Sequence, residues 1–179
     1  VNSENTSDSA SGTTIEETTD DGKIKDDLPD KDFGGKEFPI LTTSWYNARN
    51  YIYADTQNGD VMNDALYDSI STVEGRFNVD ITLTDDEDIG VVEKTLHNLV
   101  MSGDDTYKLY HGHDTRTVQN ALNGDFLNIK SLPVIDFDKP WWRGTSDNFT
   151  IGGKLYFTEN CLSLSGIFMN YVLAVNKKL

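Results

Sequence analysis

Between positions 37 and 124, the spacing of apolar residues alternates between a strand-like and a helix-like pattern. This alternation restricts the possible folds more than any other feature. Three short segments have strand-like patterns: 38–43, 79–84 and 107–111. Each is followed by a segment in which apolar residues recur every three or four positions, as they do on one side of a helix. Because strands that alternate with helices are typical of βα units, we expect an α/β fold with a largely parallel sheet.

The helical segments begin and end at residues that favour helix boundaries. Asp60 is placed to cap a helix whose apolar stripe runs through residues 62–77. A second stripe covers 92–100 and is followed by Gly103, and a third, shorter helix is predicted to end at Gly124.

The pattern changes after Pro140. Residues 149–157 have the composition of a β-hairpin, with the dipeptide Gly152-Gly153 as a two-residue turn. Residues 168–175 are another strand candidate.

Residues 1–36 differ in composition from the rest of the chain. They contain ten acidic and four basic residues, and the first aromatic residue is Phe33. Such a segment buries too little apolar surface to offset the entropy lost on ordering. We therefore expect a disordered acidic linker over 1–36 and a folded domain over 37–179. The alternative interpretation of the first segment is an acidic arm that binds another protein.

Charge and motif content exclude several function classes. The formal net charge of −15 disfavours nucleic acid as a partner, because phosphate binding needs clustered Lys and Arg. Cys161 is the single cysteine, so no internal disulfide can form. The sequence contains no serine or cysteine nucleophile motif and no phosphate-binding glycine loop. We therefore expect that the chain binds no cofactor and is not an enzyme.

Six stretches carry a family resemblance by their order and spacing. They are Asp32–Phe38, Asn58–Tyr67, Val73–Val79, Leu132–Trp142, Ile151–Tyr156 and Asn176–Leu179. Together they resemble the first lobe of a family 1 extracellular solute-binding protein, the sugar-type substrate-binding lipoprotein of ABC importers. The resemblance covers about residues 32–179.

This resemblance implies a periplasmic-binding-protein-like lobe of type II, in which a mixed, mostly parallel sheet is flanked by helices. It implies that residues 37–179 are the first lobe and that the sequence stops before the second. It also implies a lipid anchor upstream of Val1, a location on the extracellular face of a Gram-positive membrane, ABC permease subunits as partners, and a sugar or oligosaccharide as ligand.

Ligand contacts in such a fold come from loops at the carboxyl ends of the strands. In the loop after the first strand, Trp45 and Tyr46 are candidates to stack on a sugar ring. Asn47 and Arg49 are candidates to bind its hydroxyl groups. The alternative interpretation is an ordinary surface loop.

The turn after the third strand carries His111, His113 and Asp114. We consider three interpretations: ligand contact, a solvated turn, and a zinc site of a metal-dependent hydrolase, which would need a third ligand. Trp141 and Trp142 follow Pro140, which suits the start of a helix. We expect one ring to pack into the sheet edge and the other to face the cleft, and the alternative is that both rings pack in the core.

Solute binding is therefore the first functional hypothesis. A single-lobe interaction or scaffold protein at the cell surface is the second, because an isolated lobe exposes surface that its partner lobe would cover. The hydrolase built on His111–Asp114 is the third.

Overall fold

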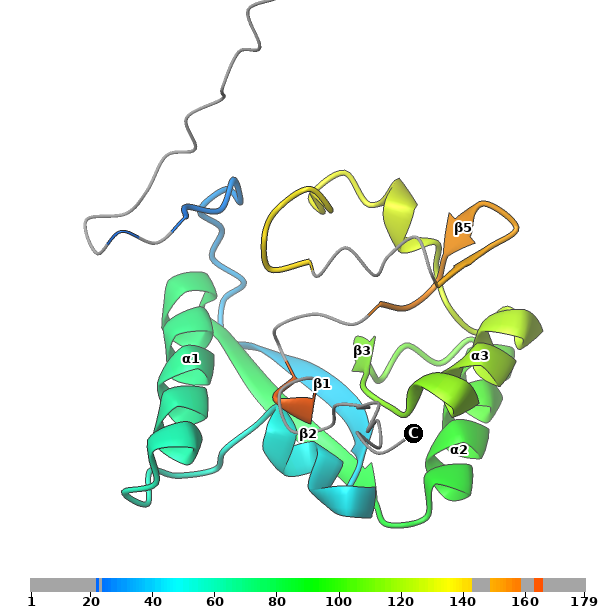
Figure 1. Ribbon diagram of the computed structural model, residues 1–179, viewed down its shortest axis with the longest axis horizontal. Coiled ribbons are helices and arrows are strands. Elements are labelled where there is room, and N and C mark those ends of the chain that lie inside the picture. Colours follow the sequence, from blue (N-terminus) through cyan, green and yellow to red (C-terminus); the bar gives the residue numbers. More distant parts are fainter. Residues whose placement is uncertain (1–21, 23, 143–148, 159–162, 166–179) are drawn as a thin grey trace, which may run out of the picture.

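The computed structural model describes residue 22 and residues 24–142, 149–158 and 163–165. Its described part is mixed α/β, with helices flanking a parallel three-stranded sheet, as the sequence predicts (Figure 1). The strands are β1 (Lys36–Thr43), β2 (Val79–Asp86) and β3 (Leu109–Tyr110). They lie in the order β2-β1-β3, so β1 is the central strand.

The predicted helix boundaries are confirmed. The helices are α1 (Val61–Phe77), α2 (Ile89–Ser102) and α3 (Asp114–Asn123). The Asp60 carboxylate accepts hydrogen bonds from the N–H groups of Met62 and Asn63, in the first turn of α1, at 3.0 and 2.9 Å. Gly103 and Gly124 end α2 and α3 with φ values of 71° and 84°, a conformation that glycine adopts without a steric penalty.

Neighbouring residues of β1 build two separate hydrophobic clusters, because side chains alternate between the two faces of a strand. Ile40 packs with Ile52 and Ile81 on the side of α1. Leu41 packs with Val92 and Leu96 of α2 on the opposite side. Helix α1 accordingly lies on one side of the sheet, and α2 and α3 lie on the other (Figure 1).

Strand β3 is shorter than the predicted 107–111. It pairs only with residues 40 and 41 of β1 within the described part of the chain. The carbonyl of Pro39 accepts a hydrogen bond from the N–H of Lys108, but Pro39 has no N–H to donate back. The ladder therefore stops at that point.

The predicted hairpin is confirmed as β4 (Thr150–Ile151) and β5 (Lys154–Leu155). Both turn glycines, 152 and 153, have positive φ, of 56° and 79°, as a tight two-residue turn requires. The fully buried Leu155 donates its N–H to the Asn128 side chain, which precedes the short 3₁₀ helix η2 (Ile129–Ser131). The predicted strand at 168–175 lies outside the described residues.

The last part of the range predicted to be a disordered linker is in contact with the folded domain. Residues 26–35 contact the carboxyl-terminal end of α1, where Asp26 pairs with Arg76 and Phe33 lies next to Phe77. Composition alone missed these contacts because their partners lie more than 40 residues further along the chain. The prediction for residues 1–21 and 23 falls outside the described residues and stays a prediction.

None of the helices in the described ranges has both the length and the apolar character that crossing a membrane would require.

Candidate functional site at the carboxyl edge of the sheet

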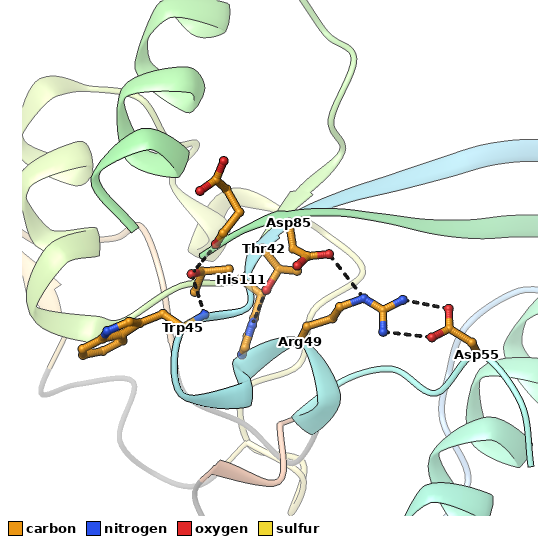
Figure 2. A network of polar contacts seen from close by, with 8 residues as sticks. Thr42, Trp45, Arg49, Asp55, Asp85 and His111 are labelled. Atoms are coloured by element: carbon orange, nitrogen blue, oxygen red, sulfur yellow. Dashed lines mark hydrogen bonds and ion pairs between the residues drawn. The ribbon is translucent and has the colours of Figure 1, made fainter. Parts of the chain in front are cut away.

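The loops after β1 and β3 leave adjacent parallel strands in opposite directions. The β1 loop leads to α1 on one face of the sheet, and the β3 loop leads to α3 on the other. In open α/β sheets, ligands bind outside the carboxyl ends of the strands at such a switch point. Figure 2 shows the polar contacts that hold this edge together.

The loop after β1 forms the short helix η1 (Trp45–Tyr51), which begins with an unusual backbone. Tyr46 and Asn47 both have left-handed dihedral angles, with φ of 50° and 59°. Such a conformation costs a non-glycine residue about 1–2 kcal/mol. Strain of this kind is concentrated at binding and catalytic sites, and here it falls on two residues that the sequence selects as ligand contacts.

The Thr43 hydroxyl anchors the start of this loop. It donates to the Asp86 carbonyl of β2 at 2.9 Å and accepts from the Trp45 N–H at 3.1 Å. Thr43 is 1% exposed, so water does not compete for either hydrogen bond. The position of Trp45 is therefore fixed by the central strand and its neighbour.

Three rings from two loops gather at this edge, and we call them the aromatic cluster: Trp45, Tyr46 and His113. Trp45 lies edge-to-face with Tyr46, with 4.4 Å between centroids, and with His113 at 5.6 Å. Tyr46 is 69% exposed and Trp45 39%. Large aromatic surface is therefore open to solvent beside strained backbone, which suits a ligand with an apolar face.

A polar pair of one buried and one partly buried residue lies at the ends of β1 and β3, where the aromatic cluster also forms. Thr42 Oγ1 and His111 Nδ1 are 3.0 Å apart (Figure 2). Burial lowers the pKa of His111 from 6.5 to about 4, so the imidazole is neutral at pH 7. A neutral imidazole has one donor and one acceptor nitrogen, which matches the hydrogen bonding of a hydroxyl group.

Arg49 is held by two carboxylates in this structure. Its guanidinium donates two hydrogen bonds to Asp55, at 2.7 and 3.0 Å, and its Nε lies 3.4 Å from Asp85 (Figure 2). The hydrogen bonds from Arg49 hold the pKa of Asp55 below its usual range. The predicted hydroxyl-binding residue thus ties η1 to the carboxyl end of β2, and it positions the loop that carries Trp45.

The histidine turn does not have the geometry of a metal site. His111 Nδ1 faces Thr42, whereas His113 Nδ1 lies 2.9 Å from Asp114 and 3.0 Å from the Thr115 hydroxyl. Within the described ranges, no group of three His, Cys, Asp or Glu residues could hold a metal ion. Asp114 is instead occupied by His113 and by the first turn of α3, where it accepts from the Thr115 N–H.

The tandem tryptophans lie elsewhere. Residues 139–142 form a turn in which the Trp142 N–H donates to the Lys139 carbonyl, and Trp142 packs on Phe137 with 5.1 Å between centroids. Lys139 also pairs with Asp27, near the end of α1 that precedes β2. Trp141 and Trp142 are therefore on the amino side of the sheet, away from the aromatic cluster. Residues 143–148 lie outside the described residues, so the predicted helix there is not described.

Sequence reasoning missed the residues that support the site: Thr42, Thr43, Asp55, Asp85 and Gly112. The partners of Thr42, Thr43 and Asp85 lie far away in sequence, so no local pattern marks these residues. Asp55 and Gly112 have partners close by: Asp55 binds Arg49, six residues before it. That glycine separates two histidines and faces the ring of Tyr110, and a Cβ built there would overlap the phenol group.

Gly112→Ala should therefore destabilise the protein by about 1–2 kcal/mol, since overpacking forces a buried side chain to move. Tyr110 stacks on Phe126 with 5.7 Å between centroids and has little room to shift. Urea unfolding would measure the change. Gly75→Ala, within α1, is the matched control. A Cβ at this position meets no other atom, and alanine favours a helix more than glycine does, so this variant should be slightly more stable than wild type. Equal stability of Gly112→Ala and wild type would contradict the close packing of Tyr110.

No protein-family model matches this chain, and no curated protein matches it.

Proposed function

We propose that this chain is the extracellular substrate-binding component of an ABC importer, and that it captures a carbohydrate without changing it chemically. The aromatic cluster beside the Thr42–His111 pair is the observation that carries the proposal. It joins exposed rings, which suit the C–H face of a sugar, to a neutral hydrogen-bonding group, which suits its hydroxyls. Both lie at the switch point of a parallel sheet.

The finer assignments belong to the same proposal. The lobe is of the type II periplasmic-binding-protein-like class, supported by the parallel sheet with helices on both faces. A lipid anchor upstream of Val1 holds it at the outer face of a Gram-positive membrane, where permease subunits receive the ligand. These assignments rest on the six stretches that resemble family 1 solute-binding proteins.

The position of Arg49 changes one detail of the expected binding mode. Its guanidinium is engaged by Asp55 and Asp85, so hydroxyl recognition is assigned to His111 and to Asn47, which follows Tyr46 in the strained start of η1. Arg49 supports binding indirectly, by fixing the orientation of η1.

Tryptophan fluorescence and calorimetric titration of this chain with a panel of neutral mono- and oligosaccharides would test the proposal. We expect saturable binding, and we expect Trp45→Ala to weaken it about tenfold through loss of ring stacking. Trp142→Ala is the matched control, since its ring packs on Phe137 away from the site. Absence of binding across the panel, or equal losses in the two variants, would contradict the proposal.

A further inference from the structure

Arg76, near the end of α1, binds three groups in residues 26–35, the segment before β1 that we call the leader. Its guanidinium donates to both carboxylate oxygens of Asp26, at 2.6 and 3.0 Å, and to the Leu28 carbonyl at 3.1 Å. Its Nε lies 3.8 Å from Asp30. Two parallel hydrogen bonds from one guanidinium fix direction as well as distance, so this pair specifies how the leader runs.

The leader also completes the carboxyl-terminal end of α1. The last carbonyls of a helix have no partner inside it. Here the Phe33 N–H donates to the Phe77 carbonyl at 2.9 Å, and the Gly35 N–H donates to the Asn78 carbonyl at 2.8 Å. The Asn78 side chain in turn donates to Asp32 at 2.7 Å. Helix and leader therefore satisfy each other's polar groups.

These contacts lie at the amino edge of the sheet, where β1 and β2 begin. Both strands are eight residues long and run from there to the carboxyl edge. At about 3.3 Å per residue, the two edges are about 25 Å apart. Figure 1 shows the leader, in blue, approaching the sheet beside the end of α1, at the opposite end of β1 from η1.

We propose that residues 26–35 form a docked leader that fixes the direction in which the N-terminal segment leaves the domain. The carboxyl edge, which carries the aromatic cluster, then faces away from the side on which the preceding chain leaves the domain. This inference rests on the proposed function only for the role of that edge. Release of the docked leader would free these ten residues, which can span up to about 35 Å, and would remove the fixed orientation.

Amide hydrogen exchange of the full chain tests the docking directly. The Phe33 and Gly35 amides should exchange slowly in wild type, and about fivefold faster in Arg76→Gln, because local opening becomes easier. Arg116→Gln, which removes an arginine on α3, is the matched control and should leave both rates unchanged. Exchange of these amides at the rate of an unstructured peptide in wild type, or equal rates in wild type and Arg76→Gln, would overturn the proposal.

A distance between two spin labels tests the orientation. Labels at Pro29→Cys and Asn98→Cys, in a Cys161→Ser background, should give one narrow distance distribution that broadens when Arg76→Gln is added. A broad distribution without the Arg76 change would overturn the proposal. Carbohydrate titration separates this inference from the proposed function: protected amides with no sugar binding would leave the docked leader intact, whereas sugar binding with unprotected amides would refute the docking alone.

Discussion

Leu41→Ala is expected to lower the free energy of unfolding by about 3 kcal/mol, the largest loss that we anticipate from a single substitution. Leu41 is 3% exposed and lies in the central strand, where it packs between Val92 and Leu96 of α2. Truncation removes buried apolar surface and leaves a cavity that the paired strands on both sides of β1 cannot close.

Urea unfolding followed by circular dichroism would measure this loss. Leu127→Ala makes the same chemical change at a leucine that is 74% exposed, and it should alter stability by less than about 0.5 kcal/mol. Similar losses in the two variants would show that Leu41 is not packed in the core as described.

The second large effect concerns pH. Burial lowers the pKa of His111 to about 4, whereas the unfolded chain titrates near 6.5. Between these values the unfolded state binds a proton that the folded state does not, so stability must fall as the pH falls. From pH 7 to pH 5 we expect a loss of about 2 kcal/mol from this residue.

His111→Asn should remove this pH dependence, because the asparagine amide can still reach Thr42 but does not titrate. Burial raises the pKa of Glu93, which acts in the opposite sense, and comparison of the variant with wild type cancels that contribution. His113→Asn removes an exposed imidazole and keeps His111, so the dependence should persist. Unfolding free energies measured at several pH values would test this prediction. If the unfolding free energy depended on pH equally in wild type and in His111→Asn, the burial of this ring would be contradicted.

The sequence predicted most of the secondary structure because its determinants are local. Asp60 caps α1 and Gly103 ends α2, and each binds backbone groups only two to four residues away. The length of β3 was not predictable in this way, since it depends on a proline in a different strand. The docked leader was missed for the same reason: Asp26 finds its partner Arg76 only after the chain has folded.

The candidate site was predicted in part. The rule that ligands bind at the carboxyl ends of parallel strands selected the loops of Trp45 and His113, and the structure brings these two rings together. It does not bring Trp141 and Trp142 to the same edge. Two adjacent tryptophans predict that large apolar surface will be packed against other groups. Which groups those are depends on the tertiary fold, and for Trp142 the partner is Phe137.

The central position of β1 determines the order in which the chain can assemble. β1 is made first, yet its partners in the sheet follow much later: Thr43 bonds to a residue 43 positions further on, and Thr42 to one 69 positions further on. During synthesis, the apolar run Ile40-Leu41 therefore emerges without a neighbour, and it stays unpaired until α1 and β2 have left the ribosome. Loop closure over such separations slows folding, so the strand that lies at the centre of the finished sheet is open to misassociation while the chain is incomplete.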